Sequence, residues 1–342
     1  MPRKEIIDQY SRELETTYQQ RTGKSQKIIR DGSRYVPDGD MRISVWMEPY
    51  PTVMKRGDGC RLYDVDGNEY LDFSNNWTSM VLGNNHPRVV EAITRQAAQG
   101  SAMAAPFEQV YDWAGMICDR IPAMERVRFC TSGTEACMFA IRGARAFTGK
   151  DKILKMEGNY HGSYDIMEMQ VGWRKLPPGL PKSAEQDVLT TPFNDKESAE
   201  KLIRENRDEL ALVMFAGVNY YTGQAYDIES IAAKCQEHGI PLGLDLAHAV
   251  GNLDLQLHDH GVDFAAWCTY KYGNCGPGAV AGAFVHERHA SNQELVRLAG
   301  WWGNDPATRF RMDENTEFVA YPGAEGWQVS NPPIFSMAPL HS

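Results

Sequence analysis

Hydrophobic and polar residues follow two different patterns near the start of the chain. From residue 3 to residue 30, hydrophobic residues recur every four positions between Ile6 and Tyr18, among charged and amide residues. This spacing predicts a polar amphipathic helix or arm. Between residues 59 and 73, two short alternating runs flank the sequence Asp-Gly-Asn at 66–68, which readily forms a tight turn. The second pattern predicts a β-hairpin.

A third pattern extends from about residue 107 to residue 285, where helical segments alternate with short apolar runs. Strands that are apolar along their whole length are buried on both faces, as is typical of a parallel sheet covered by helices. We therefore predict an α/β fold with a mainly parallel sheet wrapped by helices. The six apolar runs are RVRFC, KILKM, LALVMFAG, IPLGLDLA, FAAWCTY and AVAGAFV.

The sequence contains no internal repeat, low-complexity segment or Gly/Ser linker, so we expect one main domain with smaller additions at both ends. We assign residues 1–90 to an N-terminal arm and a small hairpin segment. Residues 91–290 form the large α/β domain in this division, and residues 291–342 are the remnant of a C-terminal domain.

Composition narrows the class of protein. With 42% apolar residues, the 342-residue chain can bury a large core, which excludes a disordered chain. The net charge of −10, without a block of basic residues, argues against a nucleic-acid partner. No segment has the apolar core of a signal peptide or the length of a membrane span. We therefore expect a soluble intracellular protein without a membrane partner.

The cysteines and the acidic turn bear on metal binding. Seven cysteines, without a C-x-x-C pair, argue against a disulfide framework and against a zinc site, and they favour a reducing cytoplasm. The run Asp64-x-Asp66-Gly67-Asn68 contains the acidic residues of a calcium loop, but it lacks the spacing and the terminal bidentate glutamate. We expect no metal site.

The first candidate site lies between an apolar strand and the helix EACMFAIRGARAF, in a turn that contains Ser132, Gly133 and Thr134. A small-residue turn that opens a helix presents unpaired backbone N–H groups, the positive end of the helix dipole and hydroxyl donors. These three residues can therefore bind a phosphate. The alternative is ordinary N-capping of the helix by Ser or Thr.

The second candidate is Asp245, at the end of the apolar run IPLGLDLA. A carboxylate in an apolar strand is costly unless a positive partner compensates its desolvation, and a protonated pyridinium nitrogen would be such a partner. His248 follows at the strand's exit, where ligands of open α/β sheets bind. The alternative for Asp245 is a structural hydrogen bond.

The third candidate is Lys271, which follows an apolar strand and lies between Tyr270 and Tyr272. Partial desolvation by these aromatic residues would lower the pKa of the lysine and free its amine to form a Schiff base. The alternative is a lysine whose stem packs on the tyrosines while its ammonium group stays in water.

Together these candidates provide the groups that hold pyridoxal 5'-phosphate (PLP). Thr134 and its neighbours Ser132 and Gly133 would bind the phosphate. Tyr160, in the turn Gly-Asn-Tyr-His-Gly at 158–162, would stack on the ring. Asp245 would keep the ring nitrogen protonated, and Lys271 would form the Schiff base with the aldehyde.

The first half of the chain resembles one family of PLP enzymes. Residues from about 44 to 210 resemble class III aminotransferases of the glutamate semialdehyde aminomutase type. The resemblance rests on DVDGNEYLDF, NWTSMVLGNNHP, FCTSGTEACMFAIRGARAFTGKDKILKMEGNYHGSYD and TTPFND. In that family Trp77 falls where the chain contacts substrate, so the resemblance implies a substrate residue there.

The second half resembles another family. Residues from about 212 to 342 resemble kynureninase, on VNYYTGQAYDI, GLDLAHAVGNLDLQLHDHGVDFAAWCTYKYGNCGPGAVAGAFVHERHA, GWWGNDPATRFRMD and QVSNPP. The change falls near Val213 to Val218. Both families share the fold-type I architecture of PLP enzymes, which the resemblance implies for this chain.

The kynureninase resemblance implies roles for individual residues. Asp245 and His248 match the pair near the ring nitrogen, and Lys271 matches the Schiff-base lysine. Tyr270 matches a tyrosine implicated in proton transfer. Trp301 and Asn331 match residues that line the cofactor and substrate pocket.

Three functions follow as hypotheses. The first is a kynureninase-like hydrolase that cleaves L-kynurenine to anthranilate and L-alanine, the second an aminotransferase or aminomutase of the glutamate semialdehyde type, and the third a PLP-binding pseudoenzyme. The kynureninase-like part ends at Ser342, so we expect a truncated C-terminal small domain without the arginine that holds the substrate carboxylate in that family. Both families build their sites at a subunit boundary, so the resemblance implies a homodimer.

Overall fold

The computed structural model describes residues 2–41, 46–121, 123–124, 126–169, 171, 176–276, 278–290, 292, 294–295, 300–311, 317–327 and 330–342. The chain forms two compact units, Met1–Val90 and Glu91–Ser342. Helix α4 (Pro87–Gln99) contains the boundary between them.

The first unit begins with two helices where the hydrophobic spacing predicts one. Helix α1 ends at Arg21 and α2 begins at Gly23, because Thr22 leaves the helical region, with φ −127° and ψ 34°. The Thr22 hydroxyl donates to the carbonyl of Tyr18. The elements of this unit are α1 (Pro2–Arg21), α2 (Gly23–Gly32), η1 (Pro37–Gly39), β1 (Met54–Asp58), β2 (Arg61–Asp64), β3 (Glu69–Leu71) and α3 (Asn75–Thr78).

The predicted hairpin is the pair β2–β3, which joins β1 in an antiparallel three-stranded sheet. Its turn is organised by two carboxylates. Asp64 accepts hydrogen bonds from the backbone N–H groups of Asp66 and Asn68, from the Asn68 amide and from the Tyr70 hydroxyl. Asp66 accepts from the first N–H groups of α2, at Lys24 and Ser25. In the run that resembles a calcium loop, both aspartates therefore accept hydrogen bonds from protein groups.

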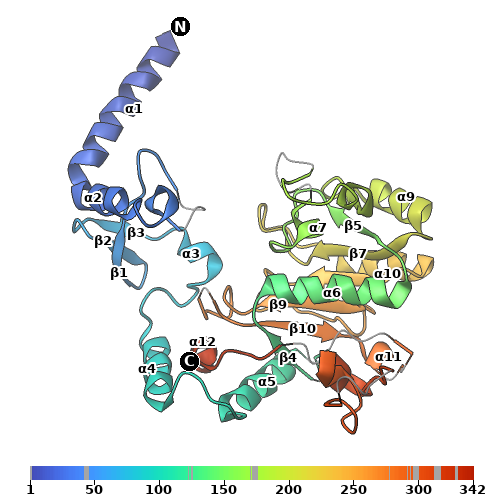
Figure 1. Cartoon of the computed structure of the whole chain (residues 1–342). Helices are drawn as coiled ribbons and strands as arrows, with labels where there is room; N and C mark the ends of the chain where they lie inside the picture. Colours follow the sequence, from blue (N-terminus) through green and yellow to red (C-terminus); the bar gives the residue numbers. More distant parts are fainter. Residues whose placement is uncertain are drawn as a thin grey trace. The chain divides into compact units, whose positions relative to one another are not determined.

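The second unit is built on a seven-stranded sheet in the order β4-β10-β9-β8-β7-β5-β6 (Figure 1). Strand β10 runs antiparallel to both of its neighbours, and the remaining pairs are parallel, which confirms the predicted α/β fold with a mainly parallel sheet. The strands are β4 (Arg128–Cys130), β5 (Lys152–Met156), β6 (Val188–Thr191), β7 (Leu210–Ala216), β8 (Leu242–Asp245), β9 (Phe264–Cys268) and β10 (Ala281–Val285).

Two hydrophobic cores cover the two faces of this sheet. Successive residues of β7 alternate between them: Leu212 and Met214 pack with the core beneath α6, whereas Val213 and Phe215 pack with the core beneath α9 and α10. This alternation explains why β7 is apolar at every position. The helices of this unit are α5 (Glu108–Arg120), α6 (Gly133–Thr148), α7 (Asp165–Glu168), α8 (Ala184–Asp187), α9 (Lys196–Asn206), α10 (Ile228–His238), α11 (Glu287–Ala290), η3 (Gly300–Gly303), η5 (Gly323–Trp327), α12 (Ile334–Met337) and η6 (Ala338–His341).

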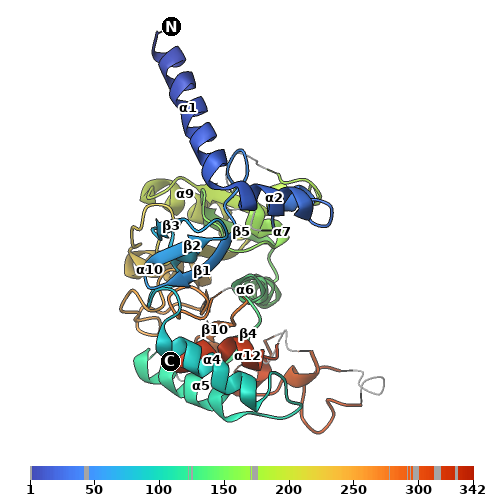
Figure 2. The same cartoon turned by 90° about the vertical axis from the view of Figure 1, so that its left-hand side faces the viewer.

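Helix α6 crosses β9 and β10 on one face (Figure 1). The chain ends beside α5 (Figure 2). There Met337 packs with Trp113 in a third, smaller core.

Strand β5 buries a charged residue. Lys155 is only 1% exposed, and its Nζ donates a hydrogen bond to the carbonyl of Met167 at 2.9 Å. Burial lowers the pKa of Lys155 from 10.5 to about 8, because the charged form loses its hydration. Folding therefore opposes protonation of this amine.

We expect Lys155→Met to reveal this cost as a pH-dependent difference in stability. Below pH 8 the folded wild type bears the full penalty of its buried ammonium group, and the penalty disappears as pH rises from about 8 to 10.5, where the unfolded chain binds more protons than the folded one. The free energy of unfolding of the wild type relative to the variant should rise by about 3 kcal/mol across this interval. Urea denaturation at several pH values measures it, and a difference that stays constant would contradict a buried ammonium group.

Candidate active site

Four loops that follow parallel strands meet at one edge of the sheet. Ser132 follows β4, Tyr160 follows β5, Asp245 ends β8 and Lys271 follows β9. Strands β4, β5, β8 and β9 run in the same direction, so their carboxyl ends share this edge. Ligands of open α/β sheets bind at such an edge. The three candidate segments of the sequence are thus brought to one side of the sheet.

The start of α6 combines capping with free backbone donors. The Ser132 hydroxyl accepts from the N–H of Glu135, and the Glu135 carboxylate accepts in turn from the N–H of Thr131. This is a reciprocal cap of the kind that begins many helices. The N–H groups of Gly133 and Thr134 lie in the first turn, where no intrahelical acceptor exists, and are available to a phosphate.

Gly133 and Gly162 allow close packing around this helix start. A Cβ atom at Gly133 would lie 3.4 Å from Cβ of Cys268, so α6 begins directly over the end of β9. A Cβ atom at Gly162 would lie 2.5 Å from Oγ1 of Thr134, and Gly162 has φ +106°. The Thr134 oxygen also accepts from the N–H of Ser163. The turn at 158–162 is therefore held against the phosphate-binding helix start.

We expect Gly162→Ala to weaken PLP binding by about tenfold or more, because the added methyl group strains the backbone and pushes Thr134 away. Gly158→Ala is a matched control in the same turn: Gly158 also has positive φ, +75°, but open space surrounds its Cβ position. Titration of the apoprotein with PLP, followed by absorbance, measures both affinities. Equal losses in the two variants would show that strain alone, and not contact with Thr134, determines the effect.

Asp245 pairs with His161, a residue for which the sequence analysis predicted no role. His161 Nδ1 lies 2.9 Å from Asp245 Oδ2, and the N–H of Ala247 donates to the other carboxylate oxygen. Burial raises the pKa of Asp245, but hydrogen bonding and attraction by His161, with help from Ala247 and Lys271, outweigh burial and keep it below its usual value. Asp245 is therefore an ionised carboxylate in a buried place.

His161 also carries a sign that the site is incomplete without a ligand. Its side chain is 1% exposed, yet Nε2 makes no hydrogen bond to any residue in the part of the chain that the structure describes. Buried polar atoms nearly always have a partner. With the free N–H groups of α6 and the ionised Asp245, this orphaned nitrogen fits a site that holds a polar group such as PLP.

Lys271 differs from the prediction in the direction of its pKa shift. Burial does lower the pKa of its amine, but attraction by Cys268, Tyr270 and Asp245 and a hydrogen bond with Tyr270 outweigh burial, so the pKa is raised. The Nζ atom lies 5.3 Å from the centre of the Tyr270 ring. The predicted low pKa is wrong, because the neighbours Cys268, Tyr270 and Asp245 together outweigh the effect of burial on the amine.

His248 belongs to an aromatic cluster next to this lysine. Its ring stacks on Tyr220 at 6.2 Å and meets Tyr272 edge-on at 5.8 Å. Burial and the neighbouring Lys271 lower the pKa of His248 to about 4, with a weaker opposite effect of Asp245. His248 is therefore neutral at physiological pH.

The remaining predicted residues are less closely connected to this cluster. Tyr160 is 46% exposed, and its hydroxyl pairs with Ser163. Asn331 is exposed, and the side chain of Trp301 lies outside the described part of the structure. Trp77 belongs to the first unit, where it is exposed within a left-handed turn: each residue from Asn75 to Thr78 has positive φ.

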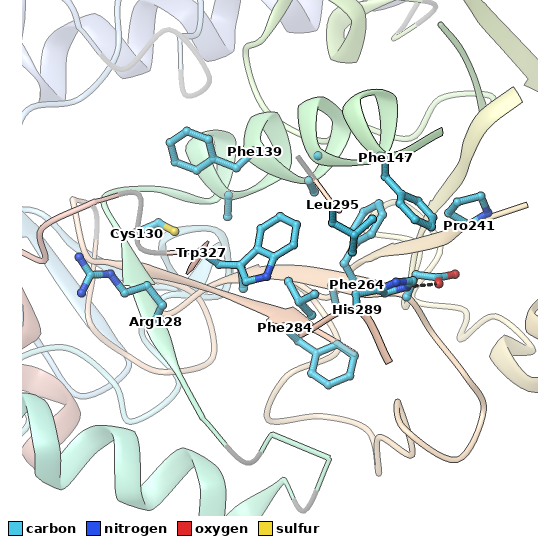
Figure 3. Close-up of a pocket in the computed structure, with 18 residues that line it drawn as sticks. Arg128, Cys130, Phe139, Phe147, Pro241, Phe264, Phe284, His289, Leu295 and Trp327 are labelled. Carbon is cyan, nitrogen blue, oxygen red and sulfur yellow. Dashed lines mark hydrogen bonds and ion pairs between the residues drawn. The ribbon is translucent and has the colours of Figure 1, made fainter. Parts of the chain in front are cut away.

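A separate hollow lies between α6 and the strands β9 and β10 (Figure 3). Its volume is about 100 Å³, Trp327 lies at its centre, and an ion pair between Asp263 and His289 closes one end. None of Asp245, His161 or Lys271 lines this hollow. It is therefore not the candidate active site.

Comparison with known proteins decides the family. The model of the family described as aminotransferase class-III matches residues 43–244, more than half of the chain. The chain belongs to the class-III aminotransferase family. An omega-transaminase from Sphaerobacter thermophilus is 30% identical, with a TM-score of 0.73 over 92% of this chain and 71% of that one. A transaminase with PLP bound is 26% identical, with a TM-score of 0.75 over 94% and 72%.

Curated relatives of this class-III chain carry another name. Kynureninase of Xanthomonas oryzae pv. oryzae is 58% identical over 140 residues, which are 41% of this chain and 32% of the relative. Kynureninase of Nematostella vectensis is 46% identical over 194 residues, 56% of this chain and 38% of the relative. The chain thus spans about a third of the length of these relatives.

These findings confirm the fold-type I architecture, the resemblance to both families and the dependence on PLP. The chain therefore belongs to a family of PLP-dependent enzymes. Among the described residues, no helix is both long and apolar enough to cross a membrane. In the same residues, no group of three or more His, Cys, Asp or Glu side chains is placed to hold a metal ion.

Proposed function

We propose that the chain is a kynureninase-like hydrolase that cleaves L-kynurenine to anthranilate and L-alanine. This proposal rests on which family the residues around Lys271 resemble. Asp245, His248, Tyr270 and Lys271 all belong to the stretch that resembles kynureninase, and relatives of that name reach 58% identity. The residues nearest the reacting atoms therefore follow the hydrolase pattern.

PLP, when bound, supplies an electron sink for charge that develops at the substrate's Cα. In this proposal the N–H groups at the start of α6 hold its phosphate and Tyr160 covers its ring. Asp245, ionised and paired with His161, holds a proton on the ring nitrogen. His161 fixes the direction of that carboxylate and is a positioning residue.

Lys271 and Tyr270 would move the protons. The Lys271 amine would hold the cofactor at its aldehyde and would also be the group that takes the proton from the substrate's Cα. Burial raises the pKa of Tyr270, although Lys271 opposes this effect, so the phenol keeps its proton at neutral pH and can donate it. Neutral His248, with Tyr220 and Tyr272, contributes an aromatic wall without adding a second cation beside Lys271.

An aminotransferase is the second candidate, because the family model matches residues 43–244 and the likeness to an omega-transaminase covers 92% of the chain. Incubation of the PLP-loaded protein with L-kynurenine, with and without an added keto acid, distinguishes the two. Anthranilate fluorescence that needs no keto acid supports the hydrolase. Amine exchange that depends on the keto acid, without anthranilate, supports the aminotransferase. A folded protein that binds PLP but performs neither reaction would be a pseudoenzyme.

We also propose that the chain acts as a homodimer. In α1, Ile6, Tyr10 and Leu14 are all more than half exposed, and this apolar face of a long arm is typical of a surface that a second subunit covers. Light scattering of the active protein tests this proposal. A monomer that retains full activity would contradict it.

A further inference from the structure

We propose that Tyr220 is a positioning residue of the candidate active site, which holds His248 beside Lys271 and connects it to the turn at 158–162. Tyr220 lies in the loop that follows β7. Strand β7 is parallel to β5 and β8, so this loop leaves the sheet at the edge where the candidate residues meet. The inference rests on the proposed function only for the roles of Lys271 and Asp245 toward the cofactor, and it applies to both candidate reactions.

The ring of Tyr220 is stacked on the imidazole of His248. Their centres are 6.2 Å apart, and their planes are inclined by 27°. Tyr272 meets the same imidazole edge-on, and its hydroxyl group lies 3.4 Å from Nδ1 of His248. Tyr220 is itself 47% exposed, so its ring shields the stacked face of the imidazole from solvent.

The hydroxyl group of Tyr220 reaches another part of the site. It donates a long hydrogen bond, 3.4 Å, to the carbonyl of Gly158. Gly158 begins the turn that carries His161, the partner of Asp245. One side chain thus contacts both His248 and the turn that positions the buried carboxylate.

The loop holds Tyr220 in place through the side chain of Asn219, which is 7% exposed. Its Oδ1 accepts hydrogen bonds from the N–H groups of Tyr221 and Thr222, and its Nδ2 donates to the hydroxyl of Tyr226 at 3.3 Å. A buried amide therefore fixes the backbone on both sides of Tyr220. The ring loses little further freedom when it packs on His248, so the contact is formed at low entropic cost.

The contacts of Tyr220 join the two patterns in the sequence. Tyr220 and His248 belong to the stretch that resembles kynureninase, whereas Gly158 belongs to the stretch that resembles class III aminotransferases. A residue of one pattern therefore supports a turn of the other at the same site.

Shielding of His248 matters because the imidazole lies next to a cation. Burial and Lys271 lower the pKa of His248 to about 4, and Asp245 has a weaker opposite effect. The other titratable groups that face the imidazole in the described part of the chain are the phenols of Tyr220 and Tyr272. Without the Tyr220 ring, water reaches His248 and can hydrate its charged form, so the pKa rises toward its ordinary value of 6.5.

NMR titration of the PLP-loaded full chain, with isotope-labelled histidines, tests the shielding. The His248 signal is identified by its absence from a His248→Gln variant. We expect it to stay constant in the wild type between about pH 5.5 and about pH 8, and to titrate at least about one pH unit higher in Tyr220→Ala than in the wild type. Tyr220→Phe keeps the ring and should keep the wild-type titration. If Tyr220→Ala does not fold, Tyr220→Ser exposes the imidazole in the same way.

Tyr221→Ala is the matched control, because Tyr221 is the next residue, is 87% exposed and meets Tyr220 only edge-on. It should leave the His248 titration unchanged. The hydroxyl group has its own readout: Tyr220→Phe should bind PLP about twofold to fivefold more weakly than the wild type, because the turn at 158–162 loses one hydrogen bond.

The titration needs no turnover and can be repeated on the apoprotein, so a failure of the proposed function leaves it interpretable. In an active enzyme, Tyr220→Ala should also lose about tenfold in rate below about pH 6 and recover as His248 becomes neutral. A His248 midpoint that stays at its wild-type value in Tyr220→Ala, or rises equally in Tyr221→Ala, would overturn the proposal. Wild-type affinity of Tyr220→Phe for PLP would contradict the connection to the turn.

Discussion

Replacing Lys271 with alanine is expected to remove the absorbance band between about 410 and 430 nm that a PLP Schiff base gives, and to reduce turnover about a thousandfold or more. The amine is at the edge where four strand ends meet, and both proposed reactions need it to hold the cofactor and move the Cα proton. Absorbance before and after borohydride reduction, together with anthranilate formation, measures the two losses.

The chain contains a matched control for this substitution. Lys155 is a buried lysine whose pKa burial lowers to about 8, so its amine is a weaker base than that of Lys271, whose pKa is raised. Yet it is 1% exposed and bonded to the carbonyl of Met167, so Lys155→Met should leave the band in place. A band that survives Lys271→Ala and disappears in Lys155→Met would show that the wrong lysine has been assigned.

The raised pKa of Lys271 predicts how the enzyme acquires its cofactor. A cationic amine must lose a proton before it attacks an aldehyde, so PLP loading of the apoprotein should become faster as pH rises from 7 toward the pKa of the lysine. Stopped-flow absorbance at several pH values measures this rate. A rate independent of pH would indicate that Lys271 is neutral in the apoprotein.

The sequence predicts the fold where the hydrophobic pattern of a single segment shows whether that segment is buried. β7 is apolar at every position because it is covered on both faces, and that pattern predicts the parallel sheet. β10 is equally apolar, yet it runs antiparallel to both neighbours. Its direction could not be predicted, because an unbroken apolar run is the same for a parallel and an antiparallel strand. The break between α1 and α2 at Thr22 was also not predicted. It arises from the backbone angles of Thr22, and the residues on either side of it do not indicate a helix end.

The candidate site was predicted in part for a similar reason. Ser132, Asp245 and Lys271 follow strands of one direction, so their meeting at one edge follows from the fold class. The pairing of Asp245 with His161 could not be predicted from the sequence. The two residues are 84 positions apart, and only the order of the strands in the sheet brings them together. The only signal was the carboxylate itself, which in an apolar strand must have a partner.

Replacing Asp245 with asparagine should lower turnover by about a hundredfold or more. Asparagine keeps the shape and can still accept a hydrogen bond from His161, but it lacks the negative charge that holds a proton on the ring nitrogen. We expect the variant to bind PLP with an altered absorbance spectrum and to form anthranilate slowly. Steady-state kinetics and absorbance at about neutral pH measure both effects.

Asp263 provides the control, because it is equally buried and also pairs with a histidine, at 2.7 Å from His289. It precedes β9, which is parallel to β8, so it lies at the opposite edge of the sheet from Asp245. Asp263→Asn loses comparable buried contacts, including those to Arg288 and the N–H of Leu242, and should lower the melting temperature while the PLP spectrum stays normal. If turnover in both variants fell only in proportion to stability, Asp245 would be a structural carboxylate, and the assignment of the cofactor's ring nitrogen to it would be wrong.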